Sequence, residues 1–343
     1  MTYLHGWSVI PQILVRRERW PGGYKTRAVP LVYPGQDVEP DQPIIRLERK
    51  DPSEAVPTVP QVPHLSPHVA RDDLHKESRQ AQSDALVKDQ YLGETLPAGL
   101  RGRVVDITRR GGVIIESKAA LLQGVIGAGN QVAGKLTMWQ PPGFVGGAEN
   151  IPEGALLVIP GPLNSTMLRQ AVVAGVSGII ASSISSRDLE SFLHVNLVEL
   201  IDSIDAESAQ ASLPQMTILL TEGPGTIAMP TRTMRLLGHY QGSMALLSGA
   251  TSIRQGIFPE LVFSLPAAEI QQGWHPMRPD TTLSPGVQVR VCSGDHEGAI
   301  GTIDYLYTHQ QVFSSGILAR SARLRLEDGS LLTVPLTLIE RIS

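Results

Sequence analysis

The segment Ser284-Pro-Gly-Val-Gln-Val-Arg290 opens the part of the chain whose pattern decides its fold. Its valines alternate with other residues, which is typical of a strand with one buried face. Asp328-Gly329 is a dipeptide that favours the tight turn of a β-hairpin. Three more runs continue the pattern: Gly301-Thr-Ile303, Leu324-Arg-Leu326 and Leu331-Leu-Thr-Val334. Residues 284–343 are therefore predicted to form a small all-β barrel.

The order of these signals (Gly-x-x-Val-Arg, a glycine turn, Gly-x-Ile, Asp-Gly and Val-Pro) resembles the KOW-type SH3-like barrel. Barrels of that type bind RNA, ribosomes, polymerase or other proteins and rarely carry out chemistry. From Ser284 onward the sequence has five arginines and no lysine against six acidic residues, whereas nucleic-acid affinity depends on an excess of cations. A protein contact is therefore favoured over RNA binding. In the alternative case the candidate phosphate contacts are Arg290, Arg320, Arg323 and Arg325.

Composition bounds the number of domains and the compartment. At 343 residues, 42% of them hydrophobic, the chain is long enough for two or three cores. A formal charge of -4 and 5% aromatic residues are unlike a protein that stacks on single-stranded nucleic acid. Cys292 is the only cysteine, which excludes an intrachain disulfide. No segment has the apolar length of a membrane span, so we expect a cytoplasmic protein without membrane contact.

The N-terminal part contains two β-rich segments that are predicted to be the two halves of one domain. Residues 32–47 comprise a strand, a Pro-Gly turn, the phrase Asp-Val-x-Pro-x-x-Pro-Ile and another strand. This phrase looks like half of a biotinyl/lipoyl-type barrel-sandwich hybrid, and residues 100–116 look like the other half. We predict a split β-domain from residues 1–48 and 98–150. Its hairpin tip, Arg109-Arg-Gly-Gly112, lacks the lysine that would carry lipoyl or biotin, so no cofactor is expected.

Residues 49–97 separate the two halves and differ from them in character. The run from Asp51 to Pro67 places proline repeatedly among polar residues, a composition that is stiff, extended and unable to bury a core. Two interpretations remain open: an exposed excursion between the halves of a β-domain, or an arm that docks on a partner.

Gly124, Gly127 and Gly129 have a spacing that invites comparison with a dinucleotide-binding loop. Such a loop needs a preceding strand, a following helix and an acidic residue about twenty positions later. Here a strand-like segment, Gln131 to Trp139, follows instead. Turns within a β-structure are the better interpretation.

In the middle of the chain, strand-like and helix-like segments alternate. Ala155-Leu-Leu-Val-Ile159 is a continuous apolar run typical of a strand buried on both faces, and Asn164 or Ser165 can cap a following helix. This alternation predicts a three-layer α/β domain with a mostly parallel sheet over residues 151–265, followed by a linker at 266–283. The chain as a whole is thus predicted to be a multidomain α+β protein.

The strand ends of the α/β region suggest one ligand site. In an open parallel sheet, ligands bind beyond the carboxyl ends of the strands, and a helix N-terminus adds amide donors for an anion. We predict a small-anion site with a guanidinium as the clamp and one nearby carboxylate. The residues expected to converge are Ser165, Thr166, Thr221, Glu222, Thr251 and Arg254. The alternative is that the serines and threonines are ordinary cap and turn residues.

Patterns for catalysis or metal binding are not recognised in the sequence. A Gly-x-Ser-x-Gly elbow and a P-loop are both missing. His64 and His68 have helical spacing but lie in the proline run, which excludes a shared helical face. Catalysis is therefore the less favoured class, with no catalytic or metal-ligating residue predicted.

Taken together, the segments resemble an uncharacterised bacterial family that joins a split lipoyl-like β-domain, an α/β domain and a KOW-like barrel. Besides the barrel motifs, the resemblance is carried by residues 15–19, 32–47, 114–116, 122–125, 220–223 and 249–256. It implies an architecture but no activity. We predict a non-enzymatic scaffold or assembly protein that binds protein partners and self-associates. The alternatives are a nucleic-acid or ribosome-associated factor and a regulatory protein that binds a small anion.

Overall fold

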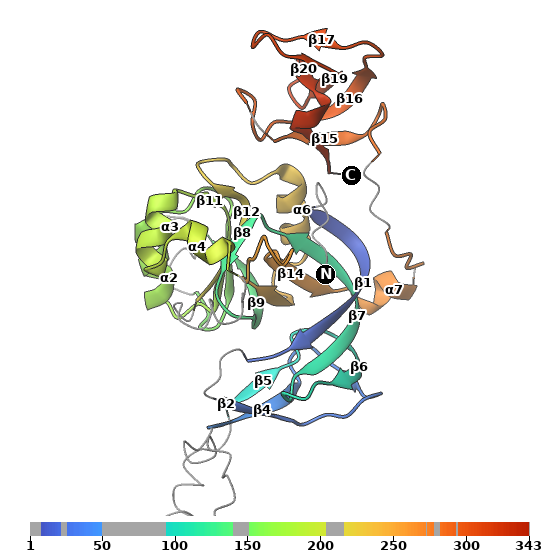
Figure 1. The fold of residues 1–343 in the computed structure, drawn as a ribbon. Helices are drawn as coiled ribbons and strands as arrows, with labels where there is room; N and C mark the ends of the chain where they lie inside the picture. The colour runs from blue at the N-terminus through green and yellow to red at the C-terminus, as the bar shows by residue number, and fades with distance from the viewer. Residues whose placement is uncertain are drawn as a thin grey trace, which may run out of the picture.

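The computed structural model describes residues 8–21, 26–49, 94–139, 151–203, 216–271, 273–277, 282–292 and 294–342. Strands dominate these residues, and short helices are attached to one large sheet (Figure 1). The protein is therefore of the broad α+β class that the sequence predicts. No helix in these ranges has the length and apolar character needed to cross a membrane.

An eleven-stranded mixed sheet forms the body of the molecule. Ten of its strands follow one another in the order β3 (Asp37–Val38), β6 (Gly102–Ile107), β7 (Val113–Gln123), β14 (Glu260–Ser264), β13 (Met244–Ser248), β9 (Val132–Met138), β10 (Leu156–Ile159), β11 (Gly178–Ile184), β12 (Thr217–Pro224) and β8 (Ile126–Ala128). The eleventh, β1 (Val9–Arg19), runs antiparallel to β7. β7 is long enough to pair with β6 near its start and with β14 near its end.

The sheet curls, so that β7 and the end of the strand order at β12 and β8 come close together. β8 follows β7 directly in the chain but pairs with β12 at the far end of the strand order. Between them, the amide of Gly124 donates to the carbonyl of Pro259 at 2.8 Å, and the amide of Val125 donates to that of Leu220 at 2.9 Å. The glycine motif therefore lies where the chain leaves β7 and enters β8, which pairs with β12.

Close backbone approach requires glycine at this junction. A Cβ on Gly127 would lie 2.6 Å from the carbonyl oxygen of Ile218, and one on Gly249 would lie 2.2 Å from that of Ala128. Thr251 completes the junction, because its Oγ1 accepts from the Gly127 amide at 2.9 Å and donates to the Gly127 carbonyl at 3.0 Å. We call this set the glycine seam: Gly124, Gly127, Gly129, Gly249 and Thr251.

The two faces of the sheet carry different helices and different cores. α2 (Ser165–Val173), α3 (Ser186–Leu193) and α4 (Leu197–Ile201) share one apolar core with β11, to which Ile179 belongs. α6 (Thr231–His239) shares the other core, to which Ile180, Phe263 and Leu237 belong. Neighbouring residues of β11 thus enter opposite cores, which explains why the strand is buried along its whole length.

The pairing directions only partly match those expected for residues 151–265. β10, β11 and β12 are parallel to one another, as predicted for this region, and β9 from before residue 150 is parallel to β10. β13 and β14, in contrast, are antiparallel to their neighbours. The large sheet also contains strands from both sides of residue 150, where the sequence predicts a domain boundary.

A separate three-stranded antiparallel sheet consists of β2 (Thr26–Pro30), β4 (Pro43–Arg49) and β5 (Thr95–Pro97). Its residues Ile44 and Ile45 share a core with Val104 and Ile115 of the large sheet. The hydrophobic contact explains how two sheets with different strand directions stay together. The proline-spaced run from Asp51 to Pro67 lies outside the described residues.

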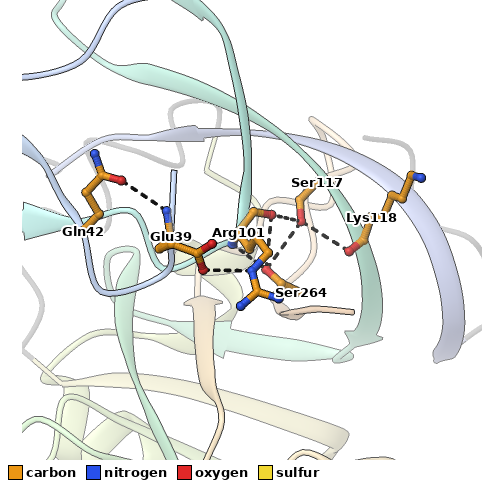
Figure 2. A network of polar contacts seen from close by, with 6 residues as sticks. All are labelled: Glu39, Gln42, Arg101, Ser117, Lys118 and Ser264. Carbon is orange, nitrogen blue, oxygen red and sulfur yellow. Dashed lines mark hydrogen bonds and ion pairs between the residues drawn. The ribbon is translucent and has the colours of Figure 1, made fainter. Parts of the chain in front are cut away.

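Polar contacts around Arg101 attach the turn between β3 and β4 to the large sheet (Figure 2). Arg101 Nε donates to Glu39 Oε2 at 2.8 Å, and the Arg101 amide donates to Ser264 Oγ at 2.7 Å. Ser117 Oγ donates to the Arg101 carbonyl at 2.6 Å. One residue thus connects the loop before β6 to β7, β14 and the turn after β3.

The C-terminal residues form a five-stranded antiparallel sheet with its own core. Its strands are β15 (Gln288–Val291), β16 (Ile300–Leu306), β19 (Ser321–Leu326), β20 (Leu331–Pro335) and β21 (Ile339–Arg341), in the order β20-β19-β16-β15-β21. Between β16 and β19 the chain makes a small hairpin of β17 (Gln311–Val312) and β18 (Leu318–Ala319). The all-β content predicted for residues 284–343 is present. Figure 1 shows this five-stranded sheet at one end of the molecule and the β2-β4-β5 sheet at the other; we call the five-stranded part the barrel, after its predicted class.

Candidate interface site between the barrel and the body

A pocket of about 210 Å³ lies where the C-terminal barrel meets the body. The body contributes Val125, which follows β7, and Glu222 and Ile227 from β12 and the loop after it. The barrel contributes the remaining residues: Arg290, Val291, Cys292, Glu297, Gly298 and Glu340. The pocket therefore has apolar walls and an excess of carboxylates around one guanidinium.

Arg290 connects three strands through two buried carboxylates. Its Nη1 donates to Glu222 Oε2 at 2.5 Å, across the boundary between body and barrel. Its Nε donates to Glu340 Oε1 at 2.7 Å, and its Nη2 contacts the same oxygen. The side chains of Glu222 and Glu340 are 3% and 4% exposed, and that of Arg290 is 12% exposed. We call these three residues the arginine cluster.

Local structure positions each member of the cluster. Arg290 in β15 lies directly opposite Glu340 in β21, so these two side chains are cross-strand neighbours. Glu222 lies in β12 at a register shift between Ala181 and Ser183 of β11. A register shift of this kind turns a side chain out of the regular alternation, and here the side chain is directed to the barrel.

The electrostatic state of the cluster follows from its burial. Burial raises the pKa of the Glu222 carboxyl above its usual 4.5, and the charge of Arg290 counteracts this rise only in part. Burial also raises the pKa of the Cys292 thiol to about 11, assisted by the negative charge of Glu340. A thiol in that state is protonated at neutral pH and is a poor nucleophile. The buried charges of the cluster therefore hold the barrel and the body together.

A second polar contact joins the barrel to the body through α6. Arg232 Nη1 contacts the carbonyl oxygen of Ile342 at the end of the barrel, and its Nη2 donates to the Val9 carbonyl in β1 at 3.2 Å. Burial lowers the pKa of the Arg232 guanidinium. Gly298 lies close to Ile227, because a Cβ there would be 3.1 Å from Ile227 Cγ2. The barrel is thus held to the body by the cations Arg290 and Arg232 and by apolar contact at Gly298.

The six residues predicted to form an anion site fall into two groups. Ser165 and Thr166 begin α2 after β10, and Glu222 and Thr221 lie near the end of β12, at the carboxyl edge of the parallel strands. Thr251 belongs to the glycine seam, and Arg254 forms an exposed bidentate ion pair with Asp202, at 2.7 Å for both bonds. The Asn164 carboxamide, rather than a ligand, accepts from the Thr166 amide.

The direction of β13 separates these groups. β13 is antiparallel to β9, and its residue Leu247 lies opposite Val132 at the start of β9. The loop that follows β13 therefore starts at the amino edge of the parallel strands, where Gly249 approaches Thr217 at the start of β12. The six residues consequently do not share one crevice.

The arginines named as candidate phosphate contacts differ in their surroundings. Arg290 is buried in the arginine cluster. Arg323 and Arg325 both form ion pairs with Asp304, at 2.6 and 3.1 Å. Arg320 is exposed, next to β18. Sequence reasoning named Glu222 and Arg290 for two different ligands, whereas the structure pairs them with each other.

Two residues of the interface were not predicted from the sequence. Glu340 carried a detectable signal, because it follows the predicted strand pattern and can lie opposite Arg290 once the barrel closes. Arg232 carried none, because its partners are backbone carbonyls far away in the sequence. Within the described residues, no group of three or more His, Cys, Asp or Glu side chains is arranged to hold a metal ion.

No protein-family model matches the chain, and a search of curated proteins found no match. The geometry of the barrel and its interface is therefore the basis for a proposal about function.

Proposed function

We propose that this chain is a non-enzymatic assembly protein of the cytoplasm that self-associates through its C-terminal barrel. In this proposal the barrel is of the KOW-type SH3-like class, and the N-terminal β-structure is of the split barrel-sandwich class. The observation that carries the proposal is an exposed apolar surface on the part of the barrel that is remote from the body.

This surface lies on residues 305–321, which we call the distal hairpin. The hairpin extends β16 and β19, because the Tyr307 amide donates to the Ser321 carbonyl at 3.0 Å and Val312 lies opposite Leu318 further along. Val312 is 74% exposed, and four more apolar side chains are also exposed or half-buried: Tyr305, Tyr307, Ile317 and Leu318. Clustered apolar side chains on a surface are typical of a protein contact.

The arginine cluster supports the proposal because it fixes how the barrel is presented. Arg290 and Arg232 hold the barrel to the body on one side, at the pocket and at α6. Figure 1 shows β17 at the end of the barrel that points away from the body. A partner can therefore approach the distal hairpin without displacing the body.

Sedimentation velocity over a micromolar concentration series tests the proposal. We expect the average mass to rise with concentration, and Val312→Asp to shift the equilibrium toward the monomer because it places a charge in the contact. Val173→Asp is the matched control, since Val173 is 88% exposed on α2, outside the barrel. A wild-type protein that stays strictly monomeric over the series would contradict the proposal.

A further inference from the structure

The chain also contains a short repeat of three triplets, which lies far from the distal hairpin in the sequence. Residues 56–64 read Val-Pro-Thr, Val-Pro-Gln, Val-Pro-His, so that valine, proline and a polar residue each recur at every third position. A polyproline II helix has three residues per turn, so in that conformation triplets of this kind would place the valines on one edge, the prolines on the next and the polar residues on the third. We call residues 56–64 the triplet segment.

We propose that the triplet segment of one copy docks on the distal hairpin of a second copy. This inference rests on the proposed self-association and names the surfaces that produce it. Proline-rich segments in the polyproline II conformation bind apolar surfaces that contain aromatic rings, at a low entropy cost because they are already extended. The valine and proline edges of the triplet segment supply the apolar ridge that such a surface accepts.

The hairpin offers the features that this kind of ligand needs. Tyr305 and Tyr307 pack edge to face, with ring centroids 5.2 Å apart, and each ring carries a hydroxyl that can donate to a peptide carbonyl. Val312 and Leu318 are exposed cross-strand neighbours further along the hairpin. These side chains and the two tyrosines, which we call the apolar strip, give the hairpin aromatic rings, aliphatic groups and donors.

Charge also agrees with this pairing. Asp51 and Glu54 precede the triplet segment in the sequence. Arg320 is exposed immediately after β18, at the base of the distal hairpin. An acidic flank on the ligand and a cation beside the apolar strip favour one direction of docking over the reverse.

The position of the segment in the fold favours docking between copies. The excursion that contains it leaves β4 after Arg49 and returns before β5 at Glu94, and the Leu47 amide donates to the Glu94 carbonyl at 2.9 Å. Both ends are therefore anchored at the β2-β4-β5 sheet. Figure 1 shows that sheet at the end of the molecule opposite to the barrel. Docking of one copy on the next is then head to tail, a heterologous contact that forms rings or filaments.

A complementation experiment tests this arrangement with the full chain. One variant loses the ligand (Val56→Ser, Val59→Ser and Val62→Ser), and the other loses the surface (Val312→Ser and Leu318→Ser). We expect each variant alone to be monomeric in sedimentation velocity. An equimolar mixture should form a dimer, because each variant supplies the half that the other lacks. Val173→Ser with Val198→Ser, both exposed on helices, is the control and should associate as the wild type does.

A labelled peptide of residues 54–68 provides the second measurement. We titrate it with the variant that lacks the three valines, so that no copy of the segment competes, and follow fluorescence anisotropy. Adding Val312→Ser and Leu318→Ser to that protein should weaken binding about tenfold, since buried apolar anchors dominate such contacts. Circular dichroism and thermal unfolding confirm that both variants fold.

The outcomes separate this inference from the proposed function. If the surface variant dissociates but the ligand variant associates like the wild type, the hairpins contact something other than the triplet segment, and only the inference is overturned. If the peptide binds while the wild-type chain stays monomeric, the segment docks within its own chain, and both docking between copies and self-association are overturned.

Discussion

The glycine seam and the arginine cluster both join parts of the molecule that are distant in sequence, but they do so by different physical means. In the seam, glycines let backbone meet backbone, so that Gly249 approaches the Ala128 carbonyl. In the cluster, long charged side chains span the gap between two separate cores. The seam is thus part of the folding of one body, whereas the cluster connects two bodies that each have a core of their own.

The largest effect is expected from breaking the seam. Gly249→Ala places a Cβ 2.2 Å from the Ala128 carbonyl oxygen and 2.8 Å from Thr217 Cγ2, so the backbone has to move. We expect a loss of about 3 kcal/mol in the free energy of unfolding, at the upper end of overpacking effects. Urea denaturation measures it. Gly238→Ala in α6 is the control, since a Cβ there meets nothing within 4 Å, and alanine should be neutral or stabilising.

The next effect is expected from removing the cation of the cluster. Arg290→Met leaves Glu222 and Glu340 buried without a counter-charge, which weakens the contact between the barrel and the body. We expect the barrel to separate from the body, with a larger radius of gyration in small-angle X-ray scattering. Combining it with Glu222→Gln and Glu340→Gln should restore much of the compact form. An unchanged radius for Arg290→Met would show that apolar contact alone holds the barrel.

A smaller effect concerns pH, because burial raises the pKa of Glu222 in the folded protein. The folded state then binds a proton more readily than the unfolded state between pH 4.5 and the raised pKa. The contribution of Glu222 to stability is therefore fully present below pH 4.5 and is lost as the pH rises through the raised value. We expect the stability difference between the wild type and Glu222→Gln to favour the wild type more at pH 5 than at pH 8. Parallel curves for the two proteins would contradict this assignment.

The smallest effect is expected from Arg254→Ala. The ion pair between Arg254 and Asp202 is exposed, and solvent screens pairs of this kind. We expect no measurable change in thermal unfolding and no change in the response to phosphate or carboxylate ligands. A lost thermal shift with such a ligand would restore Arg254 as an anion clamp and would require a partner at the amino edge of the sheet.

Local patterns in the sequence predicted the elements better than their partners. The Asn164 cap, the apolar strand at 156–159 and the hairpin turn at Asp328-Gly329 depend on neighbouring residues, and all three are present. The anion site required the direction of β13, which depends on packing between distant strands. Because β13 is antiparallel to β9, the loop that carries Thr251 and Arg254 starts at the amino edge of the parallel strands.

By itself, the sequence determined where many of the strands and helices form, because this depends on the hydrophobic period and on neighbouring residues. Only the tertiary structure decided that β7 pairs with β14 while β8, the next strand in the chain, pairs with β12. The same holds for the pairing of Arg290 with Glu222. The physical reason is that such pairings join residues far apart in the chain. Their geometry is set by the packing of whole cores, and no local pattern records it.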